Sequence, residues 1–409
     1  MRIAIVTTSS IDSLGGDGRV AVEFAEVLSQ NQQVLLVLSG KRGQELPVDS
    51  KVLHFFVPGP VKGSYILPLL TPKCLKDLLR TLNNFSPEVI HLHDQGPVPF
   101  VVLLWGLKHN IPVVFTCHTI PSEVVSFGLS ELFPKSKILF DNKIFDSYFD
   151  FFLKKASGII AINNSILRDL QKLGIKTSTF LVHNGRNLEM YNSVTLPDIN
   201  VSPKRLLFIG FLSHRKNQKF LIEVLSFLPK NEYILDLVGI PLDKDYLNEL
   251  KNQVKSRDVN VKFIGGVDHS EVPKYLERAH FFVSASLMEV QSLAVIEALA
   301  SGTPVISLNN ETTEELVNEK VGYNFPKDTD PETFAKKIME YSQLSSQDYE
   351  MMCMSCRERV SHMDWRQVKE KTLGVYKDLI TNSHNASSRH LKDMLKGIPK
   401  DVLSILAGD

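Results

Sequence analysis

The stretch SASLMEVQSLAVIEALASGTPVI, residues 284–306, carries the local signals that decide the fold. A short apolar run ends near Ser284, a polar loop contains Glu289, and apolar residues at helical spacing follow. Gly302 comes directly after that helical pattern and is expected to cap it, because glycine readily adopts the left-handed conformation that ends helices. Another apolar run starts at Val305. The stretch therefore predicts a strand, a loop, a helix and a second strand of a parallel sheet.

The same alternation of short apolar runs and amphipathic helical patterns continues along most of the chain. It is typical of doubly wound α/β folds, in which helices cover both faces of a parallel sheet. Two series of strands are expected. The first comprises residues 3–7, 33–38, 89–92, 113–117, 158–162 and 180–183, and the second comprises residues 205–209, 233–238, 261–264, 281–284 and 305–308.

The two series predict two Rossmann-like domains. The stretch between the two series has little periodicity and contains two prolines, a composition typical of a hinge. Such domains would face each other across a cleft at the carboxyl ends of their strands, where ligands of these sheets bind. The predicted organisation is an N-terminal domain over 1–192, a linker over 193–204, a second domain over 205–364, a helix crossing back to the first domain over 365–380, and a tail over 381–409.

Composition limits the class of protein. The 409 residues are 43% hydrophobic, enough for a core in each domain, and 46 basic residues balance 46 acidic ones. The balance offers no general attraction for nucleic acid, so no nucleic-acid partner is expected. Residues 1–6 resemble a buried strand rather than a leader, and the longest apolar run, 98–107, has about half of the ~20 residues that a membrane span requires. We expect a cytoplasmic protein.

Cysteines and acidic pairs give no metal signature. Four cysteines are too few for a disulfide framework, and Cys353 and Cys356 form the one C-x-x-C pair, without two further ligands at metal spacing. The Asp-x-Asp sequences at 243–245 and 328–330 lie in polar segments, and Pro331 follows the second as it would at a helix start. We interpret these aspartates as loop or capping residues. Neither a metal nor another cofactor is expected.

Two loops are suited to binding an anion. SLGGDGRV, residues 13–20, follows the first strand and opens a helix, so the amides of Gly15 and Gly16 could approach a phosphate. Its glycine spacing differs from the dinucleotide fingerprint, and a flexible turn explains it equally well. A helix beginning near Ser292 would direct its free amides toward a diphosphate without metal. Glu289 and Glu297 could then contact different parts of one extended ligand.

This combination resembles the retaining glycosyltransferases of the GT-B fold, family 4, through about residue 380. The resemblance implies that Glu289 binds hydroxyls of the donor sugar and that Glu297 binds the nucleotide ribose. It implies that the loop at Gly15 and Gly16 faces the donor phosphate and the acceptor. His118, within TCHT at the end of a first-domain strand, matches the histidine that the family places beside the reacting sugar.

A further match is FIGFLSHRKN, residues 208–217, with one departure from the family. The family pattern has an arginine after the glycine and a lysine five residues later, both facing the diphosphate. Lys216 keeps its place, but Phe211 replaces the arginine, so Arg215 and Arg186 are candidates to compensate, and slow turnover is the alternative. The resemblance also assigns donor contacts to these residues: Gly210, Arg215, Val267, Gln291, Ser292 and Leu293.

The resemblance implies transfer of a hexose from a nucleotide-diphosphate sugar similar to UDP-glucose, which is a substrate rather than a cofactor. His118, Glu289 and Lys216 would be the catalytic residues, and retention would follow front-face attack or a covalent intermediate. Gln291, two residues after the first glutamate, resembles diacylglycerol glucosyltransferases of the family. Residues 122–155, rich in phenylalanine and lysine, fit either a membrane surface or core packing. The acceptor could thus be a lipid at the inner face of the membrane, a glycan or a small metabolite, and a catalytically weak binding protein is the alternative to an enzyme.

Overall fold

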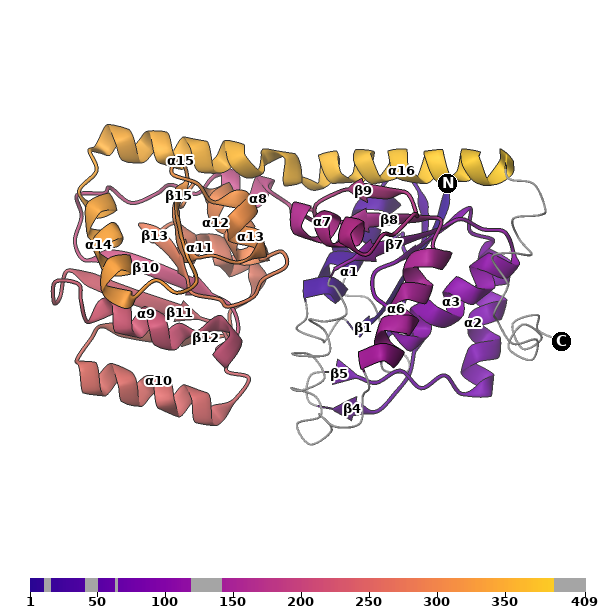
Figure 1. The fold of residues 1–409 in the computed structure, drawn as a ribbon, viewed down its shortest axis with the longest axis horizontal. Helices are drawn as coiled ribbons and strands as arrows, with labels where there is room; N and C mark the ends of the chain where they lie inside the picture. Colours follow the sequence, from indigo (N-terminus) through magenta and orange to yellow (C-terminus); the bar gives the residue numbers. More distant parts are fainter. Residues whose placement is uncertain (11–15, 41–50, 63–64, 119–141, 386–409) are drawn as a thin grey trace. The chain divides into compact units, whose positions relative to one another are not determined.

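The structure is a computed structural model that describes residues 1–10, 16–40, 51–62, 65–118 and 142–385 (Figure 1). It divides the chain into two compact units. Unit 1 comprises Met1–Gly185 and Trp365–Asp409, and unit 2 comprises Arg186–Asp364. Each unit is built around a parallel sheet with helices on its faces, which confirms the predicted pair of doubly wound α/β domains.

Unit 1 contains a seven-stranded sheet in the order β3-β2-β1-β6-β7-β8-β9, in which all pairs are parallel. A short antiparallel pair, β4 and β5, lies outside it. The strands are β1 (Arg2–Ser10), β2 (Gln33–Ser39), β3 (Leu53–Val57), β4 (Val61–Lys62), β5 (Tyr65–Ile66), β6 (Val89–Leu92), β7 (Val113–Cys117), β8 (Gly158–Ala161) and β9 (Thr179–Leu181). The helices are α1 (Gly16–Ser29), α2 (Pro72–Phe85), α3 (Pro97–Lys108), α6 (Asn142–Lys155), α7 (Asn164–Lys172) and α16 (Trp365–Asn385).

Unit 2 contains a six-stranded parallel sheet in the order β12-β11-β10-β13-β14-β15. The strands are β10 (Lys204–Ile209), β11 (Tyr233–Val238), β12 (Val261–Gly265), β13 (Phe281–Ser284), β14 (Val305–Leu308) and β15 (Gly322–Phe325). The α-helices are α8 (Glu189–Asn192), α9 (Gln218–Leu225), α10 (Lys244–Arg257), α11 (Val272–Leu276), α12 (Leu293–Ser301), α13 (Glu311–Leu316), α14 (Pro331–Ser342) and α15 (Ser346–Val360). Three 3-10 turns are η2 (His214–Lys216), η3 (His269–Glu271) and η4 (Ser361–Met363).

Both sheets reverse their winding direction beside their first strand. In unit 2 the chain proceeds from β10 to β11 and β12 on one side, then returns to add β13, β14 and β15 on the other. Connections after β10 and β13 therefore leave on opposite faces and open a crevice at the carboxyl ends of these two neighbouring strands. Ligands of doubly wound sheets bind at such a crevice. The same reversal occurs in unit 1 between β1 and β6.

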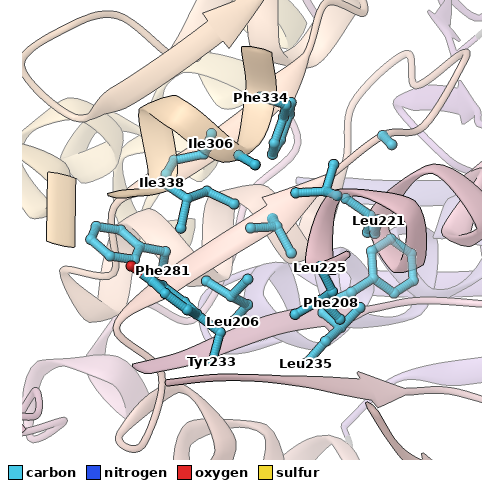
Figure 2. Packing of buried hydrophobic residues seen from close by; sticks show 14 of the residues in the cluster. Leu206, Phe208, Leu221, Leu225, Tyr233, Leu235, Phe281, Ile306, Phe334 and Ile338 are labelled. Carbon is cyan, nitrogen blue, oxygen red and sulfur yellow. The ribbon is translucent and has the colours of Figure 1, made fainter. Parts of the chain in front are cut away.

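Strand β10 shows why the unit 2 sheet is central to its core. Leu206 and Phe208 pack on one face with α9 and α14, while Leu207 and Ile209 pack on the other with α12. Figure 2 shows side chains from β10, β13, α9 and α14 converging on the first of these faces. Because both faces are covered, the strand is a continuous apolar run, as in parallel sheets generally.

The described boundaries differ from the expected linker over 193–204, because those residues belong to unit 2. Tyr191 is fully buried in the cluster that contains α12, and Ile199 is buried in the cluster that contains β10. Apolar burial thus attaches the segment to unit 2. Four strands were not expected: the sheet strands β3 and β15, and the short pair β4 and β5. Strand β3 is a partly exposed edge strand, and β15 has the sequence GYNF, which lacks an apolar run.

The helix expected over 365–380 extends to Asn385 as α16 and belongs to unit 1. Its first residue, Trp365, stacks on Phe24 of α1 with ring centroids 5.4 Å apart, and its indole nitrogen donates to Glu23 at 3.3 Å. Tyr376, one of its fully buried residues, contacts His91 of β6. No helix among the described residues is both long and apolar enough to cross a membrane.

Candidate functional site

The crevice between β10 and β13 holds two cations and a carboxylate. Lys216 Nζ forms an ion pair with Glu289 Oε1, and Arg215 Nη1 lies 3.8 Å from Glu289 Oε2. The two cations come from the 3-10 turn after β10, and the glutamate comes from the loop after β13. All three side chains are at least partly buried, with exposed fractions of 12%, 28% and 10% for Lys216, Arg215 and Glu289. Low exposure strengthens such charge interactions.

The backbone of Glu289 is fixed by the start of α13. Its N–H donates to Glu311 Oε2 at 3.0 Å, and its carbonyl accepts from both the N–H and the Oγ1 of Thr312, each at 3.0 Å. Thr312 Oγ1 also accepts from the N–H of Ser292 at 2.7 Å. Asn310 caps α13 and accepts from the N–H of Thr312. The loop that presents Glu289 is therefore tied to a capped helix rather than left to solvent.

Two glycines shape the loop that presents the cations. Gly210 has a φ of +148°, and Gly239, which also has a φ of +148°, lies so close that a Cβ on it would be 1.9 Å from the Gly210 carbonyl oxygen. Buried Gln218 then donates to the Phe211 carbonyl at 2.8 Å and accepts from the N–H of Ser213 at 3.3 Å. The turn that carries Lys216 is thus positioned by close backbone packing and by a buried amide.

The second glutamate, Glu297, lies in the second turn of α12 and is buried. Its Oε1 lies 2.8 Å from His269 Nε2 and 3.3 Å from Arg186 Nε. Tyr191 Oη lies 3.3 Å from the same histidine nitrogen. Arg186 therefore pairs with Glu297, whereas Arg215 is the arginine that lies beside Glu289. A buried carboxylate requires such partners, since an uncompensated charge would be costly.

The remaining predicted donor residues surround these groups along the chain. Ser292 precedes α12, and Leu293 is its first residue, so the helix begins where the sequence predicts. Gly302 ends that helix with a φ of +90°, which confirms the expected cap. Gln291 adjoins Ser292 in the loop, and Val267 follows β12 and packs partly buried against the cluster that contains α12. The roles assigned to these residues stay predictions.

In unit 1, His118 follows β7 and lies in a layer of histidine rings. It stacks with His93 at a centroid distance of 5.7 Å, and His93 lies 4.3 Å from His91. His91 has a partner on each ring nitrogen, Tyr376 Oη and Thr116 Oγ1, both at 2.6 Å. Burial lowers the pKa of His91 to about 3 and holds the pKa of His93 well below its usual value. His91 and His93 are therefore neutral at physiological pH.

His93 also lines a small cavity together with Phe24, Thr116 and Trp365. The cavity has a volume of about 20 Å³, which is enough for one water molecule. Neither ring nitrogen of His93 has a hydrogen-bond partner within the described part of the chain. One water in this cavity would satisfy a buried polar group that otherwise carries a desolvation cost.

Some predicted features lie outside the described residues. Gly15 is one of them, while Gly16 is the first residue of α1. Of the phenylalanine-rich segment 122–155, the structure describes α6. There Phe149 and Phe152 are buried, with centroids 6.1 Å and 5.7 Å from Phe115 of β7. This part of the segment packs on the core of unit 1.

One aspartate of each Asp-x-Asp sequence caps a helix. Asp243 accepts from the N–H of Asp245 at the start of α10, and Asp330 accepts from the N–H of Thr333 at the start of α14. Cys353 and Cys356 are buried thiols on α15 that form no disulfide. Burial raises the pKa of Cys353 to about 12, so this thiol is unreactive at neutral pH.

Three contributors to the site escaped the sequence interpretation: His269, Glu311 and Thr312. His269 lies in the 3-10 turn after β12, and the other two begin a six-residue helix. None belongs to a periodic pattern or a motif, and each reaches the site only through tertiary contacts. The one available signal was the polar run Asn-Glu-Thr-Thr at residues 310–313, which follows β14. Such a run is typical of a helix that starts near the carboxyl end of a strand.

Comparison with known proteins identifies the family and the fold. Residues 14–190 match the model described as Glycosyltransferase Family 4, and residues 197–356 match that of Glycosyl transferases group 1. The alpha-monoglucosyldiacylglycerol synthase of Streptococcus pneumoniae is 26% identical over 59% of this chain and 56% of its own length. The chain thus matches little more than half the length of that relative. An Escherichia coli UDP-Gal:alpha-D-GlcNAc-diphosphoundecaprenol alpha-1,3-galactosyltransferase is 23% identical over 93% of this chain and 98% of its own length.

Among solved structures, Anabaena HepE in complex with UDP-glucose aligns with a TM-score of 0.71 at 18% identity, covering 92% of this chain and all of that one. This likeness establishes the fold. Two doubly wound units and the two family matches, one in each unit, define the GT-B fold. The chain belongs to glycosyltransferase family 4.

Proposed function

We propose that this chain transfers glucose from UDP-glucose to a diacylglycerol-like lipid with retention of anomeric configuration. The observation that carries the proposal is the convergence of Lys216 and Arg215 on Glu289 in the crevice between β10 and β13. A sugar diphosphate presents anionic oxygens beside neutral hydroxyls. The two cations suit the former, and the carboxylate, which only accepts hydrogen bonds, suits the latter.

The residues supply what glycosyl transfer requires. When the bond between the sugar C1 and the diphosphate oxygen breaks, negative charge develops on the leaving group, and Lys216, Arg215 and the first amides of α12 would stabilise it. Glu289 would orient the sugar through its hydroxyls. The acceptor hydroxyl would attack C1 from the face that the diphosphate leaves, and its proton would pass to a departing phosphate oxygen. For His118 in unit 1, resemblance to the family suggests a role beside the reacting sugar.

Arg215 supports an active enzyme over a catalytically weak binding protein. The family's arginine is absent at Phe211, but Arg215 places a second cation at Glu289 and donates to the Met288 carbonyl at 3.1 Å. The Leu287 N–H donates in turn to the Arg215 carbonyl at 2.9 Å. These contacts hold the guanidinium beside the position where the leaving group would develop charge.

The lipid acceptor is supported by the relative from Streptococcus pneumoniae, which is named for a glucosylated diacylglycerol. Such an acceptor would bring the enzyme to the membrane surface. A polyprenyl-diphosphate-linked sugar is the second candidate, because the Escherichia coli relative that acts on one matches nearly the full chain.

Donor turnover by the purified chain tests whether it transfers a sugar and which acceptor it uses. Release of the nucleoside diphosphate, UDP or GDP, is measured with UDP-glucose, UDP-galactose, UDP-N-acetylglucosamine and GDP-mannose, each with diacylglycerol vesicles, with undecaprenyl-diphosphate-linked N-acetylglucosamine, or with neither. We expect UDP-glucose with diacylglycerol to give the fastest release. Release stimulated by the undecaprenyl acceptor alone would replace the lipid proposal, and no release from any donor would contradict glycosyl transfer.

A further inference from the structure

The contacts of Glu297 distinguish its two carboxylate oxygens. Both His269 Nε2, at 2.8 Å, and Arg186 Nε, at 3.3 Å, approach Oε1, and neither contact involves Oε2. A carboxylate accepts from His269, so the histidine Nε2 carries the proton in this contact. One oxygen is thereby held by the protein. Oε2 is the oxygen through which the side chain would accept hydrogen bonds from a ligand.

Both partners are themselves anchored. The side chain of Arg186 is 1% exposed, and its backbone N–H donates to the Met363 carbonyl at 2.9 Å. His269 begins the turn after β12, and its Nε2 also lies 3.3 Å from the hydroxyl of Tyr191, which is fully buried. The carboxylate of Glu297 is therefore contacted from two separate segments of the chain, by a hydrogen bond from His269 and an ion pair with Arg186.

We propose that Arg186 and His269 are positioning residues that hold Glu297 Oε1 and so present Oε2 to the two ribose hydroxyls of a bound nucleotide. This inference rests on the proposed function, because it takes the ligand to be a nucleoside diphosphate. A single oxygen at fixed orientation can accept from two neighbouring hydroxyls, whereas a rotating carboxylate would lose part of its binding free energy to ordering.

Arg186 could instead serve only to neutralise a buried carboxylate, and the two roles predict different ligand selectivity. Neutralisation alone supports folding and would affect all nucleotides alike. Positioning affects only ligands that carry the ribose hydroxyls. Arg186→Lys keeps the charge but loses the planar guanidinium, so it separates geometry from neutralisation and preserves compensation of Glu297. His269→Leu is a second, independent variant at a side chain that is 24% exposed, and His269→Gln restores a donor at the same place.

The experiment is calorimetric titration of the full chain with UDP and with 2′,3′-dideoxy-UDP. We expect wild type to bind UDP more tightly than the dideoxy compound by about tenfold or more, because both hydroxyls that would donate to the charged carboxylate are lost. Arg186→Lys and His269→Leu should reduce that ratio to about twofold by weakening the binding of UDP alone, as Glu297→Ala should, and His269→Gln should recover most of the ratio.

Three results would overturn the inference while leaving the donor class intact. The first is an equal loss of affinity for both compounds in Arg186→Lys and His269→Leu. The second is an unchanged ratio of UDP affinity to dideoxy-UDP affinity in both variants, and the third is an unchanged ratio in Glu297→Ala. If wild type binds neither UDP nor the dideoxy compound, the proposed uridine donor is wrong and the inference is overturned with it. Thermal unfolding of each variant identifies any that fail to fold, and the variants at the partly exposed His269 then decide.

Discussion

Lys216 and Glu289 are 73 residues apart in the sequence and form an ion pair between the loops that follow β10 and β13. These strands are neighbours in the sheet, and the winding of unit 2 reverses between them. The pair therefore lies where the topology opens a ligand crevice. A cation for phosphate and an acceptor for hydroxyls meet there because the fold brings two carboxyl strand ends together.

Arg215 is predicted to replace the arginine that the family carries at the position of Phe211. Arg215→Ala should lower the rate of donor cleavage about tenfold or more, the scale of ~1.4 kcal/mol in the barrier. Phe211→Arg should add little, since a second guanidinium already lies beside Glu289. UDP release under saturating donor is the measurement.

Arg257→Ala is the matched control for this prediction. It removes an arginine on α10 that forms a surface ion pair with Glu223 on α9. It should leave turnover unchanged. Full activity of Arg215→Ala together with a large gain in Phe211→Arg would show that Arg215 does not contribute to leaving-group stabilisation.

Thr312 is predicted to be a positioning residue for Glu289. Its buried hydroxyl donates to the Glu289 carbonyl and accepts from the N–H of Ser292. Thr312→Val keeps the shape but leaves both backbone groups without that partner, which should lower the free energy of unfolding by about 1–3 kcal/mol. Loosening of the loop should also reduce kcat.

Thr312→Ser retains the hydroxyl and is the control for that substitution. Urea unfolding and kcat with the preferred donor are compared for wild type and both variants. Equal kcat in wild type and Thr312→Val would mean that the loop holds Glu289 without this hydroxyl.

Chelation is predicted to leave activity intact, because Lys216, Arg215 and the start of α12 provide the positive charge at the diphosphate position. The Asp-x-Asp aspartates at 243 and 330 are used as helix caps. Turnover is measured before and after incubation with EDTA. Loss of activity that magnesium or manganese restores would establish a metal-dependent reaction instead.

Acid should destabilise the protein through its buried histidines. Burial lowers the pKa of His91 to about 3 in the folded state, against an ordinary value of 6.5. The unfolded chain therefore binds a proton below pH 6.5 that the folded chain does not bind until about pH 3. The contribution of a neutral His91 is complete above pH 6.5 and is lost as the pH falls toward 3, by roughly 1 kcal/mol per pH unit.

Urea unfolding at pH 7 and pH 5 tests this pH dependence. His91→Gln removes the titrating group, so the free energy of unfolding of that variant should change less between the two pH values than that of wild type. An identical change in both proteins would mean that His91 does not account for the acid sensitivity.

Local signals in the sequence predict most elements of this fold. Gly302 as a helix cap, Asp330 as an N-cap and the run at β10 each depend on neighbouring residues alone, and the structure confirms them. Strand β15 was missed because a four-residue strand with the sequence GYNF has no apolar period. The boundary near residue 192 differs because Tyr191 packs into the core of unit 2, a tertiary contact that composition does not reveal.

Within the candidate site, resemblance to the family singles out Lys216, Glu289 and Glu297 from the sequence alone. It does not predict that Arg186 pairs with Glu297 while Arg215 lies beside Glu289. By sequence these two arginines are equal candidates, because both are near glycines at strand ends. Only the positions of β10 and α12 in the fold of unit 2 distinguish them.

The most direct test of the proposed reaction is the anomeric configuration of the glucolipid formed from UDP-glucose and diacylglycerol, determined by proton NMR of the purified product. We predict an α-linked glucose from wild type and no product from folded Glu289→Ala, whose carboxylate would no longer orient the sugar. A β-linked product would contradict retention, and α-linked product formed at the wild-type rate by Glu289→Ala would contradict the site.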